Sequence, residues 1–313
     1  MQKRIILGLI LIMALGGCNQ EPIEREPPPH RESLIPPSKV KVLPGTNAYL
    51  PQSETAEYED PIPLPYPIDT AGVEDSAFIM PDGNTLYFFF TPDVNKPVKE
   101  QIADGVTGIY VSYKANGGGE PERVFLQDPG KLALDGCEFV QGNVMWFCTA
   151  QEGLAGLHWA TAELENGEWG NWMIADFQPD FEVGELHITA DGTALYFHSS
   201  RAGGKGEYDV WVSRNVDGEW QEPENVEAVN TVYSEGWPFV TQDGSELWFS
   251  TLMGAPEIYR SKWADGEWGT PEKMFSGFTG EPSIDRDGNV YFTHHFYKDD
   301  AMLEADIYVA IRT

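Results

Sequence analysis

One unit of hairpin-forming sequence recurs along the chain, and this repetition restricts the possible folds more than any other feature. Its clearest copy spans residues 191–226, where an Asp-Gly turn, an apolar triplet, a strand-forming run and a second Asp-Gly turn follow one another. Asp-Gly between apolar-aromatic runs is typical of a β-hairpin. The triplet recurs as Leu86-Tyr87-Phe88, Met145-Trp146-Phe147, Leu195-Tyr196-Phe197, Leu247-Trp248-Phe249 and Val290-Tyr291-Phe292.

Repeats of this kind predict an all-β chain, namely a five-bladed β-propeller of four-stranded antiparallel blades over residues 61–313. The fifth unit has no outer strand, whereas residues 61–68 have no inner partner of their own. We therefore expect this N-terminal strand to close the last blade and to leave no free edge at the seam.

The fullest copy also carries a family resemblance. It reads Asp-Gly-x-x-Leu-Tyr-Phe-x-Ser-x-Arg-x-Gly-Gly and is followed by Asp-Val-Trp-Val, with Ser199, Arg201, Gly203 and Gly204 at the marked positions. This pattern resembles the PD40, or WD40-like, repeat of TolB-type bacterial propellers. The resemblance implies the fold, with a six-bladed TolB-like ring as the alternative, and leaves the function open, since such propellers include scaffolds, binders and enzymes.

The first residues read as an export signal followed by a tether. Lys3 and Arg4 precede a short apolar run, which ends in Leu15-Gly16-Gly17-Cys18. These four residues resemble the bacterial lipobox, which implies removal of residues 1–17 and acylation (palmitate) of Cys18. Asn19 in place of Asp favours the outer membrane. Residues 18–60 are rich in Pro and Glu and lack apolar periodicity, so we expect a disordered tether.

The charge balance limits the possible partners. The chain has 50 acidic and 20 basic residues, for a net charge of −30. Nucleic acids and anionic lipid surfaces would be repelled by such a protein. Cations, neutral glycans and basic proteins stay possible, and we expect a monomer.

Acidic residues recur where the innermost strands of the units begin, at one mouth of the expected central channel. They are Glu74, Asp75, Asp135, Glu138, Glu182, Glu185, Glu235 and Glu281. Converging carboxylates could hold a Ca²⁺ ion, or two of them could hydrolyse a glycosidic bond. Alternatively, they cap loops and pair with Arg201, Arg214 or Arg260.

Histidines fall near the same strands. His187 is two residues after Glu185 and shares its face, and His294 and His295 occupy the equivalent of His198 in another unit. Glu185, His187 and His294 could bind a transition metal or transfer protons, or the histidines could simply form hydrogen bonds. No linear spacing matches a metal motif, so no metal site is predicted.

Cys137 and Cys148 lie symmetrically about Gly142-Asn143. A two-residue hairpin loop there would place the two cysteines opposite each other, so we expect a disulfide in an exported protein. No motif for an organic cofactor is present.

Together these features favour an envelope-anchored lipoprotein whose propeller binds a partner protein or a glycan without catalysis. The alternative is a glycan-active hydrolase or lyase. Its catalytic candidates are Glu185, Glu235, Asp135, His187 and Arg201, and the ligand-binding candidates are Glu74, Asp75, Glu182, Glu281 and His294.

Overall fold

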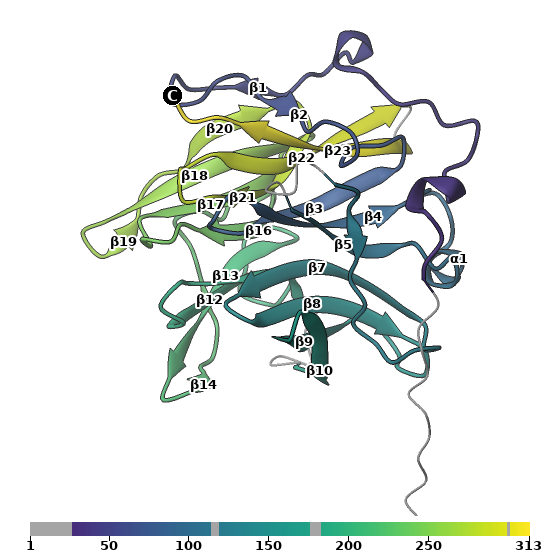
Figure 1. Cartoon of the computed structure of the whole chain (residues 1–313). Helices are drawn as coiled ribbons and strands as arrows, with labels where there is room; N and C mark the ends of the chain where they lie inside the picture. Colours follow the sequence, from purple (N-terminus) through teal and green to yellow (C-terminus); the bar gives the residue numbers. More distant parts are fainter. Residues whose placement is uncertain (1–26, 114–118, 176–182, 299–300) are drawn as a thin grey trace, which may run out of the picture.

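A computed structural model describes residues 27–113, 119–175, 183–298 and 301–313 (Figure 1). Cys18, Glu182 and the predicted signal lie outside these residues. The described chain is almost entirely β, with one short helix, α1 (Val98–Ala103), and two 3₁₀ turns, η1 (Arg31–Leu34) and η2 (Pro44–Thr46). None of the helices in the described part is long and apolar enough to cross a membrane.

Consecutive strands form antiparallel meanders, as the repeated hairpins predict. The first two meanders comprise β3 (Val73–Ile79), β4 (Thr85–Thr91), β5 (Gly108–Tyr113) and β6 (Glu122–Arg123), then β7 (Ala133–Gln141), β8 (Val144–Gln151), β9 (His158–Glu165) and β10 (Glu168–Ile174). The third comprises β11 (Val183–Ile188), β12 (Ala194–Ser199), β13 (Asp209–Val216), β14 (Glu219–Trp220) and β15 (Glu224–Asn225).

The next meander comprises β16 (Ser234–Val240), β17 (Glu246–Leu252), β18 (Pro256–Ala264), β19 (Glu267–Trp268) and β20 (Glu272–Ser276). The last comprises β21 (Thr279–Ile284), β22 (Val290–Lys298) and β23 (Ala301–Ala310). The recurring apolar triplets all lie in second strands, where they are mostly buried, so each meander buries the same positions of its repeat.

The seam joins the two ends of the repeat region. β2 (Ile62–Pro63) pairs antiparallel with β23, with Ile62 opposite Val309, and the Leu64 amide donates to the Ile307 carbonyl. The prediction that residues 61–68 pair with the last strand is confirmed. β23 also forms one parallel pair with β3, between Ala305 and Val73, so the first and last meanders share one sheet.

The first strands of the meanders pack in a cycle. β3 contacts β7, β7 contacts β11, β11 contacts β16, β16 contacts β21, and β21 contacts β3 again. A cyclic order of inner strands, each followed by its own antiparallel meander, is the arrangement of a β-propeller.

Residues 27–60, here called the N-terminal arm, are ordered against this ring, which corrects the prediction of a disordered tether for this part of the chain. Arg31 is 3% exposed and forms an ion pair with the carboxylate of Glu74 at 3.2 Å. Lys41 pairs with Glu304 at 2.8 Å, and β1 (Gln52–Ser53) adds a strand beside β20. Tyr58 is buried near Phe275. Figure 1 shows the arm, in purple, running over the ring to β1.

The arm is fixed because it supplies cations to buried carboxylates. Asp69, Glu74 and Asp306 are all buried, and their carboxylate oxygens lie within 4.8 Å of one another. Lys41 donates a hydrogen bond to Asp306, and Arg31 donates one to Glu74. Uncompensated charges of this kind are costly, so the acidic ring requires basic residues that are distant in sequence.

Asp306 gives the fold a specific pH dependence. Burial raises its pKa from the usual 3.8 to about 8, although Lys41 opposes the shift. At a pH between these two pKa values, Asp306 therefore takes up a proton when the chain folds. Its contribution to the free energy of unfolding is full below the pKa of the unfolded state and is lost as the pH rises through about 8. We expect the free energy of unfolding to fall from about pH 4 to about pH 8, by up to roughly 1.4 kcal/mol per pH unit from this group.

Urea unfolding of the wild type and of Asp306→Asn at several pH values checks this, since the variant should show a smaller slope. Asp93→Asn is the control: burial would raise the Asp93 pKa, but the hydrogen bond from Lys39 lowers it, so this carboxyl stays ionised across the window. An equal slope in the wild type and in Asp306→Asn would contradict the prediction.

Candidate functional site

Each inner strand has a β-bulge at the same place, and this bulge aims side chains at the ring axis. The registers shift between Asp75 and Phe78, Gly136 and Phe139, Val183 and Leu186, Gly236 and Phe239, and Gly280 and Ser283. The bulge residues Ser76, Cys137, Trp237 and Glu281 have φ values of 52°, 56°, 52° and 60°. A bulge of this kind redirects the side chain that it carries.

These positions line a small cavity, the axial cavity, of about 40 Å³. Each inner strand contributes three consecutive residues to its wall: Ser76 to Phe78, Cys137 to Phe139, Glu185 to His187, Trp237 to Phe239, and Glu281 to Ser283. The volume is sufficient for a few water molecules or an ion, whereas pockets for small organic ligands are roughly 300–1,000 Å³.

An aromatic layer borders the axial cavity. The ring of Phe139 lies 5.4 Å from that of Phe78 and 4.9 Å from that of His187, and His187 lies 4.4 Å from Phe239. These four side chains come from four inner strands and are all buried. The layer therefore packs neighbouring meanders together beside the axis.

The polar side of the cavity adjoins the axial cluster, which consists of Asp75, Glu185, Glu281 and His295; of these, Glu185 and Glu281 line the cavity itself. His295 Nε2 lies 3.5 Å from Asp75 Oδ1. The Ser76 amide donates to Glu281 Oε2 at 2.8 Å, and the Ser76 hydroxyl donates to Glu185 Oε1 at 3.1 Å. Three inner strands and β22 thus bring these groups together.

Burial and mutual repulsion set the protonation of the axial cluster. Burial, Asp75 and Glu185 raise the pKa of Glu281 well above its usual value, and burial with Cys137 and Asp75 does the same to Glu185. Burial alone would raise the pKa of Asp75, but the hydrogen bond and charge of His295, together with hydrogen bonds from Glu281 and the Ser76 amide, outweigh burial and lower it. The pKa of His295 is raised, because Asp75 outweighs the opposing effect of burial. These shifts favour the ionised form of Asp75 and the protonated forms of His295 and Glu281.

Three of the predicted channel acids lie elsewhere. Glu74, Asp135 and Glu235 are buried and outside the axial cavity. The Thr70 amide donates to Glu74 at 3.0 Å, the Thr231 amide donates to Glu235 at 2.8 Å, and the Thr149 hydroxyl donates to Asp135 at 2.7 Å. The prediction that these three acids face the channel is therefore wrong. They precede the bulge and face the neighbouring loops and strands, where they accept hydrogen bonds, as the alternative of a loop cap expects.

The predicted trio of Glu185, His187 and His294 is not brought together. His187 is in the aromatic layer, and burial lowers its pKa to about 3. His294 lies 2.7 Å from Asn47 Nδ2, and burial lowers its pKa to about 4. His295, the next residue, reaches the axis instead. The sequence showed both histidines, and strand alternation requires that only one of them faces the axis.

The remaining predicted residues, Arg201, Cys137 and Cys148, contact neighbouring side chains of the fold. Arg201 lies over the rings of Phe197 and Trp211, at 4.8 and 5.3 Å from their centroids, and does not line the axial cavity. Cys137 and Cys148 are free thiols, which corrects the predicted disulfide. The bulge places Gly136, not Cys137, opposite Cys148. A hydrogen bond with Cys148, followed by burial, raises the pKa of the Cys137 thiol.

A second hollow, here called the aromatic groove, adjoins the axial cluster. It measures about 400 Å³ and shares His295 with the cluster. The ring of Phe278 lies 5.3 Å from that of Tyr49 and 5.6 Å from that of Tyr297, and both tyrosines are exposed, by 62% and 43%. The N-terminal arm forms one wall, through Val40 to Val42 and Thr46 to Tyr49, and the opposite wall includes Phe278, His295, Phe296, Tyr297 and Leu303.

Comparison with known proteins identifies the architecture. No protein-family model and no curated protein matches the sequence. Among solved structures, an endo-arabinase from Bacteroides thetaiotaomicron is 14% identical, with 80% of this chain and 96% of that chain covered and a TM-score of 0.51. A protein assigned as TolB from Agrobacterium tumefaciens is 15% identical, with coverage of 77% and 90% and a TM-score of 0.41. Likeness at such identities concerns the fold alone. The cyclic order of the inner strands, each followed by its own antiparallel meander, identifies the chain as a β-propeller.

Proposed function

We propose that this protein is a lipoprotein of the bacterial cell envelope, anchored in the outer membrane through Cys18, and that its monomeric PD40-type propeller binds a neutral glycan without catalysis. The five meanders and the cyclic contacts of their first strands support five blades. The aromatic groove is the observation that carries the binding role. A partner protein as the bound molecule is the other outcome that the experiment below separates.

The groove has the size and the surface that a sugar requires. Its volume of about 400 Å³ falls in the range of small-ligand sites. Tyr49 and Tyr297 expose much of their surface, and aromatic rings of this kind suit the flat apolar face of a sugar ring. Asn47 accepts a hydrogen bond from the Tyr49 amide at 3.0 Å, which fixes the backbone beside this ring. The net charge of −30 favours a neutral glycan over an anionic one.

The axial carboxyl groups give less support to the hydrolase or lyase that is the alternative. Asp75 and Glu281 have pKa values shifted in opposite directions, which is the pattern of an acid and a base. However, their side chains hydrogen-bond each other, whereas glycosidase carboxyl groups are roughly 5–10 Å apart with the sugar between them. The axial cavity of about 40 Å³ is also too small for a sugar ring.

A glycan array combined with a hydrolysis screen on the full-length protein in detergent tests the proposal. We expect retention of a neutral glycan without turnover, and a loss of affinity of about tenfold or more in Tyr297→Ala, because the exposed ring is removed. Tyr113→Ala is the matched control, since Tyr113 is 39% exposed and lies outside the groove.

Other outcomes would overturn the proposal in distinguishable ways. Equal glycan binding by the wild type and by Tyr297→Ala would show that the glycan does not bind in the aromatic groove. The wild type could instead bind no glycan but capture an envelope protein that Tyr297→Ala does not capture. That result would mean that the groove binds a protein partner. Turnover of a glycan by the wild type, abolished in Glu281→Gln, would establish the alternative of a glycan-active enzyme.

A further inference from the structure

We propose that the axial cluster binds one divalent transition-metal ion, with zinc as the representative ion, at the edge of the axial cavity through Asp75, Glu281 and His295. This site shares His295 with the aromatic groove, but Glu281 does not line the groove, so Glu281→Gln tests metal binding apart from glycan binding. The inference is carried by the donor atoms of these residues and by a buried carboxylate, Glu138, that faces the same space.

The three donor groups are already close enough to share an ion. One carboxylate oxygen from each acid and one ring nitrogen of His295 lie within 4.8 Å of one another. Ligands held at about 2.0–2.2 Å around a tetrahedral zinc lie roughly 3.4 Å apart, so shifts of about 1 Å or less would complete the coordination. The 3.5 Å between His295 Nε2 and Asp75 Oδ1 already matches. Nε2 is the ring nitrogen beside Asp75, so it is the His295 atom that would coordinate the ion.

Glu138 is an independent observation that points to a cation. Its side chain lines the axial cavity and the residue is only 5% exposed. Both of its carboxylate oxygens are buried and have no hydrogen-bond partner among the described residues. Buried carboxylates are normally satisfied by hydrogen bonds, a counter-charge or a metal, so an ion in the cavity would compensate this group directly or through water.

The charge of the cavity wall favours the same conclusion. Glu138, Glu185 and Glu281 line this space, Asp75 lies beside Glu281, and among the described residues that line the cavity none is Lys or Arg. Among the described residues, His295 is within ion-pair distance of Asp75, and Arg123 opposes the raised pKa of Glu138 without cancelling the effect of burial. A divalent ion would offset two of the carboxylates, which His295 alone cannot do.

The donor set selects the type of ion. Ca²⁺ and Mg²⁺ are bound through oxygen ligands, and Ca²⁺ takes six to eight of them. Imidazole combined with carboxylates suits zinc and its first-row neighbours. We therefore expect zinc to bind more tightly than calcium or magnesium.

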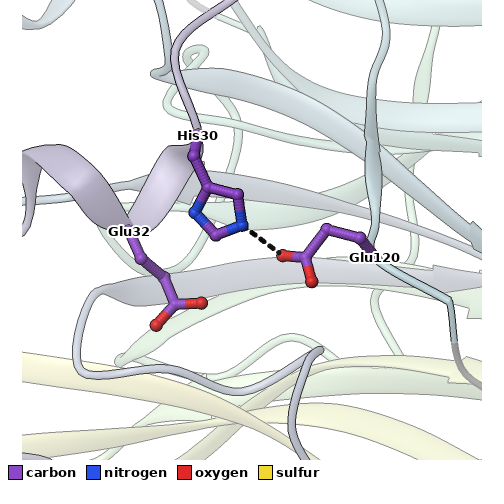
Figure 2. A group of neighbouring side chains, drawn as sticks. All are labelled: His30, Glu32 and Glu120. Atoms are coloured by element: carbon purple, nitrogen blue, oxygen red, sulfur yellow. Dashed lines mark ion pairs between the residues drawn. The ribbon is translucent and has the colours of Figure 1, made fainter.

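A second acidic group with a histidine, the exposed trio of His30, Glu32 and Glu120, provides the control. Figure 2 shows these side chains, with His30 Nε2 3.3 Å from Glu120 Oε1. The His30 side chain is 54% exposed, and that of Glu120 is 43% exposed, so a metal there would compete with water on an open surface. His30→Gln removes the donor nitrogen of this trio and leaves the axial cluster unchanged.

Titration of the metal-stripped full-length protein in detergent with ZnCl₂, followed by calorimetry, tests the proposal. We expect one ion per chain, with affinity reduced about tenfold or more in both His295→Gln and Glu281→Gln and unchanged in His30→Gln. Co²⁺ in place of zinc should give visible absorption bands that His295→Gln removes, which reports coordination by the ring. Circular dichroism establishes that each variant is folded, and Glu281→Gln serves if His295→Gln is not.

Absence of saturable zinc binding in the wild type would overturn the proposal. So would equal affinity in the wild type and in the folded axial variants, or a loss of binding confined to His30→Gln. Calcium binding that is tighter than zinc binding and insensitive to His295→Gln would overturn the choice of ion.

Discussion

Replacing Arg31 with methionine will lower the free energy of unfolding by about 3–5 kcal/mol, because the change leaves the carboxylate of Glu74 buried without its cation. Arg31 is 3% exposed and Glu74 is fully buried, with 3.2 Å between the guanidinium and the carboxylate. The guanidinium also donates to the Ile68 carbonyl at 2.8 Å and lies 5.0 Å from the centroid of the Phe90 ring. Urea unfolding of full-length protein measures the loss.

The double variant Arg31→Met/Glu74→Gln separates the cost of the uncompensated Glu74 charge from the cost of the packing lost with Arg31. Glutamine keeps the shape of Glu74 without its charge, so the double variant should recover much of the stability. Lys262→Met is a control for removal of a cation, because Lys262 and Glu272 are both exposed by more than half and lie 3.9 Å apart, and such pairs contribute about 0–1 kcal/mol. A loss below about 1 kcal/mol in Arg31→Met would mean that the N-terminal arm is not fixed by this pair.

Replacing Phe139 with alanine will also cost about 3–5 kcal/mol, because it opens a hole in the aromatic layer. Phe139 is 4% exposed, and its ring contacts Phe78 on one side and His187 on the other. The packing between three inner strands depends on this one side chain. Thermal or urea unfolding measures the effect.

Phe139→Leu is the matched control, since leucine retains most of the buried apolar volume and should cost clearly less than alanine. Equal losses for the two variants would indicate that the aromatic geometry, not the filled volume, stabilises the layer. A loss below about 1 kcal/mol for Phe139→Ala would contradict the close packing beside the axis.

Much of the architecture was accessible from the sequence because the repeat is local. The triplets from Leu86-Tyr87-Phe88 to Val290-Tyr291-Phe292 all form second strands, and residues 61–68 contribute the strand that pairs with β23. The ordering of the N-terminal arm was not accessible. Its Pro-rich composition is that of a tether. Arg31 is buried against Glu74, with which it forms an ion pair, and Glu74 is distant in sequence.

The candidate site was only partly predictable, and the reason is the bulge. A regular strand would alternate its faces, so Asp75 and Cys137 would follow simple parity with their neighbours. One extra residue between Asp75 and Phe78 reverses that parity within the strand, and no residue pattern marks where it occurs. The same shift separated Cys137 from its expected partner Cys148. The sequence therefore indicated the acidic mouth but not which acids face it.

The pairing of Ile62 with Val309, and of Tyr58 with Arg312, has a consequence for how the molecule is made. These contacts join segments 309 − 62 = 247 and 312 − 58 = 254 residues apart, so the earlier segment leaves the ribosome long before its partner, and we expect closure of the ring to be a slow step of folding. Until residue 310 or so is available, the nascent protein holds an open row of sheets with unpaired edges, and such edges are where intermolecular association begins.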